Sequence, residues 1–275
     1  EFWSYRPNRV IGGRIQSRFE AAGCTVVDGS DVLREVRWVK SPAELACIEE
    51  AGRIAETGLR AARGAIRPGV SELEVYGTMV HAMAAAGGEN PGITMPVLSG
   101  KKTWCPHAMA SRKTIKPGEL VMVDVSGVYK RYHCNMARTF ALGEPAKDVQ
   151  DIVRRAVGSM DLIRGIIKPN LRVGDLAKAL IDYYTKQGIW EERGWIGGYE
   201  MGVAFPPDWV GNFVFDPLDA QNHDRVFEPG TVINYENQFY LPREDGHFFQ
   251  IECLMFKGDH AKLMSNIPYG LDVIE

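Results

Sequence analysis

Cys105 and His107 lie two residues apart, a spacing at which a thiol and an imidazole could support nucleophilic catalysis. Such chemistry needs a thiolate, and spacing alone does not show the activation that would lower the pKa of the thiol. We therefore expect Cys105 to be an ordinary thiol. His107 remains open between a structural side chain and a proton carrier, since imidazole exchanges protons near neutral pH.

The overall composition indicates a globular enzyme of ordinary charge. The 275 residues are 45% hydrophobic and 24% charged, with a net charge of -3, which argues against a general nucleic-acid binder. No apolar run approaches the roughly 18 residues of a membrane span. The five cysteines form no Cys-x-x-Cys pair, so we expect buried free thiols in a reducing cytosol. The cysteines are Cys24, Cys47, Cys105, Cys134 and Cys253.

Two helices with the same start signal are predicted ahead of the first strands. Residues 41–44 read Ser-Pro-Ala-Glu and residues 71–74 read Ser-Glu-Leu-Glu, so each serine can cap a helix and each later glutamate can complete a capping box. Apolar residues recur at helical spacing after the first signal. The first helix should end near residues 67–69 and the second near Ala86.

Helices and strands then alternate in blocks. Strand signals cover residues 95–99, 120–126 and 136–142, and helices are predicted over 146–167 and 174–187 before a strand-rich stretch at 195–272. A pair of helices followed by strands thus occurs twice. This order predicts an α+β fold with a mainly antiparallel sheet.

Three segments, taken together in this order and spacing, resemble the creatinase/aminopeptidase P family. They are residues 98–124, residues 124–140 and residues 227–252, and the helix start at residues 40–44 also fits. The resemblance covers about residues 38–265. It implies the pita-bread fold, with two pseudo-symmetric halves that each combine a helix pair with antiparallel sheet, and a hydrolase acting on C–N bonds.

The resemblance also allows the metal-ligand positions of the family to be compared one by one. Metal-dependent members bind two divalent ions through two Asp, one His and two Glu. The corresponding positions here are Asp124, Asn135, Tyr199, Glu236 and Glu252. Asn135 cannot bridge two cations as a carboxylate does, and Tyr199 is a poor ligand because its ordinary pKa is near 10. The resemblance therefore implies no metal cofactor, or at most one weakly held ion bound by Asp124, Glu236 and Glu252.

Loss of the metals leaves a charge problem. If Asp124, Glu236 and Glu252 converge without a cation, they repel one another and the pKa of at least one rises. A cationic substrate would relieve this repulsion. The family has metal-free members, creatinase and an ectoine hydrolase, so the resemblance implies a metal-independent hydrolase of an amide, amidine or urea-type C–N bond in a small cationic nitrogen compound.

In creatinase-like enzymes a histidine ahead of the first Asp carries the proton, and that position is His107 here. We expect His107 to activate water and protonate the leaving nitrogen, with Glu236 and Glu252 binding the cationic group. Asp124 should orient the substrate, while Tyr199 and Asn135 donate hydrogen bonds. Glu200 and His133 lie near the ligand positions but out of register, and we expect them to be structural.

Residues 202–209 narrow the resemblance further. Their Gly-Val-Ala-Phe-Pro-Pro-Asp-Trp sequence is similar to a stretch that follows the Tyr-for-His change in ectoine-hydrolase-like proteins, although a rigid proline turn with a packed Trp would read the same. Three alternatives stay open. They are a metallopeptidase acting on Xaa-Pro peptides, a sulfonium lyase, which usually carries a richer acidic motif than residues 124–126, and a non-catalytic peptide- or protein-binding member.

The N-terminal region looks incomplete. The chain begins at Glu1 without an initiator Met or signal peptide, and residues 9–40 suggest a small α/β remnant with a helix at 12–22, a strand at 24–27 and a helix from Ser30. We expect residues 1–37 to be the tail of a mostly absent creatinase-type domain and residues 38–275 to be the catalytic domain. The resemblance to this family implies that the protein is cytoplasmic and forms a homodimer.

Overall fold

The fold is described from a computed structural model, in which residues 9–206, 213–242 and 246–275 are described. The chain divides into two compact units, residues 1–38 and residues 39–275. Within the described residues, every helix is too short or too polar to cross a lipid bilayer. The second unit contains all of the described strands.

The first unit has two helices, α1 (Arg9–Ala21) and α2 (Ser30–Trp38). The strand predicted over residues 24–27 is not formed. A strand needs a neighbour for its backbone N–H and C=O groups, and none of the described strands lies in this unit. The prediction of a strand was therefore wrong, whereas both helices are present.

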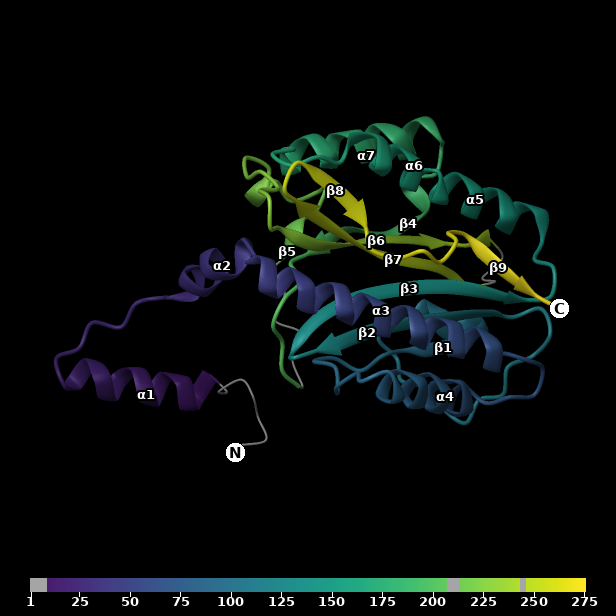
Figure 1. Ribbon diagram of the computed structural model, residues 1–275, viewed down its shortest axis with the longest axis horizontal. Helices are drawn as coiled ribbons and strands as arrows, with labels where there is room; N and C mark the ends of the chain where they lie inside the picture. Colours follow the sequence, from purple (N-terminus) through teal and green to yellow (C-terminus); the bar gives the residue numbers. More distant parts are fainter. Residues whose placement is uncertain (1–8, 207–212, 243–245) are drawn as a thin grey trace. The chain divides into compact units, whose positions relative to one another are not determined.

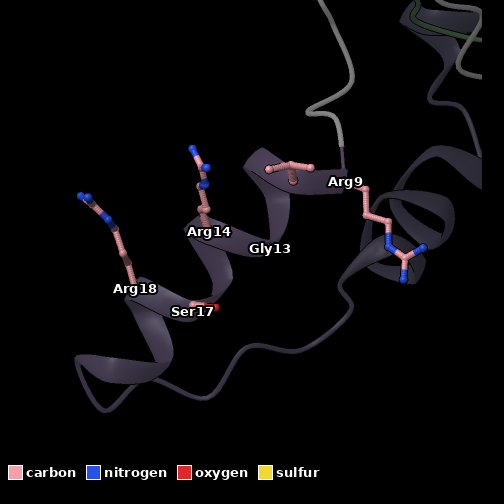
Figure 2. Close-up of a pocket in the computed structure, with 6 residues that line it drawn as sticks. Arg9, Gly13, Arg14, Ser17 and Arg18 are labelled. Atoms are coloured by element: carbon pink, nitrogen blue, oxygen red, sulfur yellow. The ribbon is translucent and has the colours of Figure 1, made fainter.

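Helix α1 carries a basic surface. None of its residues is buried, and one shallow face is lined mainly by small and basic side chains. Arg14 and Arg18 extend to one side of the helix while Arg9 points the other way (Figure 2). These three guanidinium groups do not converge on one point, so the face does not form an anion site by itself.

Two capped helices open the second unit, α3 (Pro42–Ala65) and α4 (Glu72–Ala85). Ser41 and Ser71 are their N-caps, and each hydroxyl accepts a hydrogen bond from the backbone of the glutamate three residues later. Each of those glutamates in turn accepts a bond from the backbone N–H of its serine. Both predicted capping boxes are thus confirmed.

The first half of the sheet follows these helices. It consists of β1 (Val97–Ser99), the 3-10 helix η1 (Gly100–Trp104), β2 (Leu120–Tyr129) and β3 (Tyr132–Leu142). Helix α3 lies against β2 and β3. It comes so close that a Cβ at Gly127 would lie 1.9 Å from the Ala51 carbonyl oxygen, so only glycine fits on β2 at this point.

The second half repeats this order of helices and strands. Its helices are α5 (Lys147–Val157), α6 (Ser159–Ile166) and α7 (Val173–Lys186), with short 3-10 helices η2 (Trp190–Glu192) and η3 (Ala220–Asn222). Its strands are β4 (Arg193–Tyr199), β5 (Phe213–Phe215), β6 (Val232–Tyr240), β7 (His247–Lys257), β8 (His260–Leu263) and β9 (Leu271–Ile274).

The single helix predicted over residues 146–167 is two helices that meet at Gly158. The Tyr183 hydroxyl donates to the Arg155 carbonyl at 2.7 Å, an acceptor that a continuous helix would offer to the backbone N–H of Ser159. The same hydroxyl would lie 2.1 Å from a Cβ at Gly158. A tertiary contact from α7 therefore interrupts a pattern that looks continuous in the sequence.

The strands form one sheet in the order β1-β2-β3-β7-β6-β4-β5, with β8 paired to β7 and β9 paired to β3. All of these pairs are antiparallel except β3 with β9. In Figure 1, α3 and α4 lie along β1–β3, and α5, α6 and α7 lie along the other side, by β4 and β6. The α+β architecture with its repeated halves is as predicted.

Side-chain alternation shows which face of the sheet these helices cover. On β2, Val123 packs into the core formed with α3, so the neighbouring Asp124 points away from that helix. On β6, the Tyr235 hydroxyl donates to Ser159 of α6, so Glu236 points away from the second helix group. Both carboxyl groups therefore project from the face of the sheet opposite to these helices.

The cysteines are all free, as expected. Cys134 and Cys253 are buried, but Cys24 and Cys105 are exposed and Cys47 is partly buried. The prediction that all five thiols are buried was therefore wrong. Cys24 lies in the first unit, where no core forms around α1, and Cys105 lies in the turn after η1.

Candidate functional site

Strand pairing aligns Asp124 and Glu236 across four strands. Asp124 is paired with Ala137 of β3, Ala137 with Ile251 of β7, and Ile251 with Glu236 of β6. Directly paired residues project from the same face of a sheet. The two carboxyl groups thus share one face, with the small apolar surface of Ala137 and Ile251 between them.

Amide side chains connect these carboxyl groups. Three strand spacings of roughly 4.8 Å correspond to about 14 Å between the paired backbone positions in a flat sheet. A chain of hydrogen-bonded amide side chains joins the two acids across the strands between them. Asn135 Nδ2 donates to Asp124 Oδ1 at 2.7 Å, and Asn234 Nδ2 lies 3.3 Å from Asn135 Oδ1 and 3.0 Å from Glu236 Oε1. We call these four residues the acid–amide cluster.

Tyr199 and Gln238 complete the surroundings of Glu236. Gln238 Nε2 donates to Glu236 Oε2 at 2.7 Å, and the Tyr199 hydroxyl also hydrogen-bonds this carboxylate. The same hydroxyl is 3.5 Å from Asn135 Oδ1, and the Tyr199 backbone N–H donates to Asn234 Oδ1 at 2.7 Å. Asn135 and Tyr199, the two positions predicted to be changed metal ligands, therefore both lie in the acid–amide cluster or against it.

Burial shifts the titration of these groups. The pKa of Asp124 is raised to about 7, first by burial and then by the nearby Glu236 charge, and only the hydrogen bond from Asn135 opposes this. Burial also raises the pKa of Glu236, although the bonds from Tyr199, Gln238 and Asn234 favour its charged form. The two carboxyl groups are thus desolvated and repel each other, which is the condition that a cation would relieve.

Aromatic side chains stand beside the acidic groups. The rings of Trp195 and Tyr199 are stacked with centroids 6.5 Å apart, and the Phe213 ring meets both edge-on, at 5.7 Å and 6.1 Å. The Trp195 ring lies over Gly197, where a Cβ would be only 2.3 Å from it, and Gly197 is paired with Glu236. An aromatic wall next to carboxylates is the environment that planar cations prefer.

His107 lies at the edge of the same face. It is exposed in the turn after η1, and the adjacent Ala108 packs against the apolar cluster that contains Ala137 and Ile251. The imidazole makes no hydrogen bond or ion pair with the described side chains. The imidazole is therefore exposed beside the row of side chains between Asp124 and Glu236.

A second aromatic stack borders this region. Trp104, at the end of η1, stacks on Tyr240 with centroids 4.9 Å apart, and Tyr240 stacks on His247 at the same distance. Burial lowers the pKa of His247 to about 4, so its ring is neutral at pH 7. The His107 turn is thus attached to the sheet by the ring contact of Trp104 on one side and by Ala108 on the other.

Glu252 lies apart from the cluster, contrary to the expected convergence of three carboxylates. It is paired with Tyr235, one residue out of step with Glu236, so it projects from the helix-covered face. There it binds Arg138 at 3.0 Å, and both side chains are at most 2% exposed. Its Oε1 also accepts the backbone N–H groups of Cys253 and Ser265. Glu252 therefore neutralises a buried arginine.

The residues at the five ligand positions do not fit a two-metal centre. Asn135 is neutral and already hydrogen-bonded, and burial raises the pKa of Tyr199 well above its usual value, so its phenol stays protonated. The three carboxylates expected to hold a single ion do not come together. Among the described residues, no group of three or more His, Cys, Asp or Glu side chains could hold a metal ion.

The two neighbouring residues expected to be structural have internal partners. Glu200 binds Lys40 at 2.7 Å, with both side chains at most 2% exposed. His133 Nε2 accepts the Gly92 N–H and its Nδ1 donates to the Arg131 carbonyl, which defines a neutral ring. Burial lowers the pKa of His133 to about 4. Both side chains serve the fold at these positions.

The sequence analysis did not predict four residues of the site and its surroundings, which are Asn234, Gln238, Trp195 and Arg138. Asn234 and Gln238 could have been found by alternation, since each lies two residues from Glu236 on the same strand. Trp195 and Arg138 carry no such signal. Their positions depend on which strands become neighbours, and β3 and β7 lie more than a hundred residues apart in the chain.

Comparison with known proteins decides the family. The model of metallopeptidase family M24 matches residues 46–256, which is more than half of the chain. The chain belongs to metallopeptidase family M24. This confirms the family expected from the resemblance. The relatives within this family are named for different substrates.

An Xaa-Pro dipeptidase of Pyrococcus horikoshii is 27% identical over 85% of this chain and 64% of that protein. An ectoine hydrolase of Halomonas elongata is 28% identical over 90% of this chain and 62% of that protein. The crystal structure of a prolidase from Pyrococcus horikoshii OT3 is 25% identical, with a TM-score of 0.83 over 97% of this chain and 73% of that chain. The pita-bread fold is thereby confirmed.

The chain spans only 60% to 64% of the length of the first curated relatives that it matches. The ectoine-hydrolase-like segment at residues 202–209 lies partly outside the described residues, so its Pro207, Asp208 and Trp209 take no part in the site as described. Whether residues 1–37 are the tail of a further domain stays a prediction.

Proposed function

We propose that this M24 chain is the catalytic part of a metal-independent hydrolase. It would cleave an amide, amidine or urea-type C–N bond in a small cationic nitrogen compound. One observation carries the proposal. The carboxyl groups of Asp124 and Glu236 are desolvated beside an aromatic wall, and their hydrogen-bond partners are all neutral, namely the amides of Asn135, Asn234 and Gln238 and the phenol of Tyr199. Such a site is completed by a positive ligand.

The roles of the side chains follow from the same geometry. Glu236 and Asp124 hold the cationic nitrogen group, whose charge restores ionisation of Asp124. His107 accepts a proton from water as the water oxygen attacks the carbon of the C–N bond, and it returns this proton to the leaving nitrogen. Tyr199 remains a neutral donor and stabilises negative charge on the attacked group. Glu252 has no contact with substrate in this scheme.

A second candidate is an Xaa-Pro dipeptidase, because several relatives are named as such. Against it stand Asn135 and Tyr199, which offer one neutral amide and one protonated phenol in place of two metal ligands. The two candidates differ in metal content. Two bound equivalents of Mn, Co or Fe in purified protein, together with loss of Xaa-Pro cleavage on chelation, would favour the dipeptidase.

Calorimetry with matched ligands tests the substrate class. Guanidinium and amidinium compounds should bind at least about tenfold more tightly than a urea or amide of the same shape, since the carboxyl pair favours the charge. Equal binding, or a preference for neutral or anionic ligands, refutes the proposal. Tight binding of cations with no turnover across amides, amidines and ureas would favour a non-catalytic binding protein instead.

His107→Ala tests the proton carrier. Turnover should fall by about 10²- to 10⁴-fold while affinity for the cation is retained. His81→Ala is the matched control, since His81 is an exposed histidine on α4, and it should leave turnover unchanged. Full turnover in the His107 variant would refute the assigned role.

A further inference from the structure

Glu72 is an acidic side chain that the proposed reaction does not use, and it is fully buried. It is the first residue of α4, with a relative exposure of 0%, whereas Glu74 two residues later is exposed and closes the capping box with Ser71. An ionised carboxylate taken out of water destabilises the fold unless it is fully hydrogen-bonded. The bonds that Glu72 makes therefore show what it holds.

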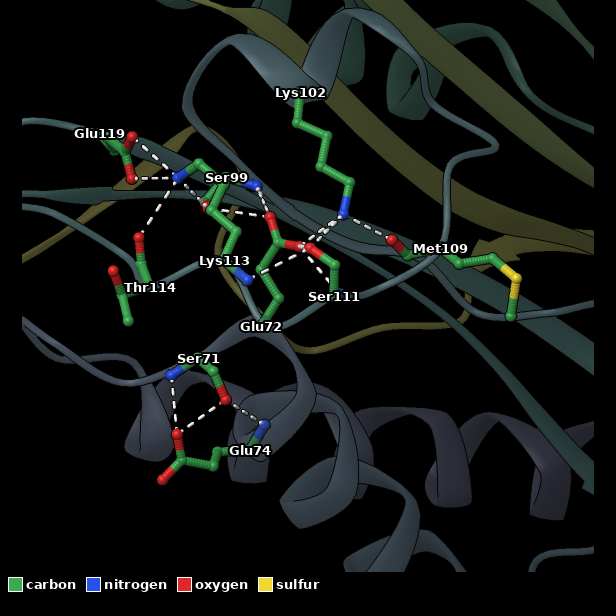
Figure 3. Close-up of polar contacts among 10 residues, drawn as sticks. All are labelled: Ser71, Glu72, Glu74, Ser99, Lys102, Met109, Ser111, Lys113, Thr114 and Glu119. Atoms are coloured by element: carbon green, nitrogen blue, oxygen red, sulfur yellow. Dashed lines mark hydrogen bonds and ion pairs between the residues drawn. The ribbon is translucent and has the colours of Figure 1, made fainter.

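Five donors surround this carboxylate (Figure 3). Oε1 accepts the Ser99 backbone N–H at 2.8 Å and the Ser99 hydroxyl at 2.9 Å. Oε2 accepts Lys102 Nζ at 2.6 Å, the Ser111 backbone N–H at 3.0 Å and the Ser111 hydroxyl at 2.9 Å. One helix residue thereby joins the end of β1, the 3-10 helix η1 and the segment that follows the His107 turn.

The two residues that donate to Oε2 close a loop. Lys102 lies directly before residues 103–110 and Ser111 directly after them, and this segment contains His107. Lys102 Nζ also donates to the Met109 carbonyl at 2.6 Å, which adds a second tie across the same loop. Holding both ends of a loop at hydrogen-bonding distance removes most of its conformational freedom.

The network is balanced in charge and reaches the next strand. Lys113 Nζ donates to the Ser99 hydroxyl at 2.7 Å and to Glu119 Oε2 at 2.7 Å, one residue before β2 (Figure 3). Two lysines thus face two glutamates, Lys102 with Glu72 and Lys113 with Glu119. Since β2 carries Asp124, the same contacts relate the His107 loop to the strand of the acid–amide cluster.

We infer that Glu72 is a positioning residue, which fixes the loop of His107 over the sheet face that carries Asp124 and Glu236. The inference rests on the proposed role of His107. Glu72 does not touch the substrate. It acts through Lys102 and Ser111, and Ala108 transmits the constraint because it packs on the apolar row between the two acids.

Glu72→Gln tests this inference, and Glu74→Gln is the matched control in the same helical turn. The first change removes the charge that binds Lys102, so backbone amides of residues 103–111 should exchange with deuterium about tenfold faster. The turnover number should fall about tenfold with KM changed less than about threefold. The control should leave the loop exchange and turnover unchanged.

Lys102→Met provides a second variant if Glu72→Gln does not fold. It keeps the bonds of Glu72 to Ser99 and Ser111 but removes all three hydrogen bonds of the lysine, to Glu72, Met109 and Ser111, so loop exchange should again quicken. Exchange at residues 103–111 that stays at the wild-type rate in the folded variants overturns the inference. Full turnover in the His107→Ala variant would instead refute the proposed role of His107, because loop exchange is measured independently of activity.

Discussion

Replacing Asp124 by Asn should stabilise the protein at neutral and alkaline pH. Burial raises the pKa of this carboxyl from 3.8 to about 7, so the folded state keeps its proton over a range in which the unfolded chain has lost it. The carboxyl therefore favours folding at low pH, and this contribution is lost as the pH rises from about 4 to about 7. Asparagine is nearly isosteric and has no charge to desolvate.

The size of the effect follows from the shift. Raising the pKa from 3.8 to about 7 corresponds to about 4 kcal/mol, which is an upper limit because the side chain is partly exposed. Between pH 5 and pH 8 the free energy of unfolding of the wild type should fall by about 2 to 3 kcal/mol relative to Asp124→Asn. The amide oxygen of the new side chain can still accept the bond from Asn135 Nδ2.

Urea unfolding at pH 5, 6, 7 and 8 measures this difference, with the midpoint and slope fitted at each pH. Asp182→Asn is the control, because Asp182 is an exposed aspartate on α7 paired with Lys178. It should change the free energy of unfolding by less than about 0.5 kcal/mol at every pH. A difference between wild type and Asp124→Asn that does not depend on pH would refute the reasoning about burial.

Three further predictions concern the frame of the site. Arg138→Met should lower the free energy of unfolding in urea by about 3 to 5 kcal/mol, because it leaves Glu252 charged and buried. Adding Glu252→Gln should recover part of this loss. Equal stability of the single and double variants would contradict the prediction. Gly127→Ala should lower the free energy of unfolding by about 3 kcal/mol or more, since the added Cβ would collide with the backbone of α3. A thiol reagent should modify Cys134 and Cys253 only on unfolding, and their rapid labelling in the folded protein would show that the core is open.

Much of the fold was predictable because it depends on local signals. The two capping boxes at Ser41 and Ser71 define their helices within a few residues, since a serine and a glutamate three residues apart satisfy each other's backbone groups. The alternation of helix pairs and strands likewise predicted the repeated halves. The break at Gly158 was not predictable, because it depends on a hydroxyl from α7.

The site divides in the same way. The family resemblance predicted Asn135 and Tyr199 as the changed positions, and the structure brings both to Asp124 and Glu236. Position in the family pattern also grouped Glu252 with them, and here the sequence misled. A shift of one residue along a strand moves a side chain to the other face, and register is fixed only when strands pair.

The sequence by itself thus determined which chemical groups this M24 chain possesses, and its family resemblance predicted which metal-ligand positions are changed. Only the tertiary structure decided which of the three carboxyl groups lie close together. Strand pairing puts Asp124 and Glu236 on one face, where two asparagine side chains link them, while pairing with Tyr235 turns Glu252 toward Arg138. The physical reason is that the distance between two carboxyl groups depends on sheet curvature and strand register, and long-range pairing sets both.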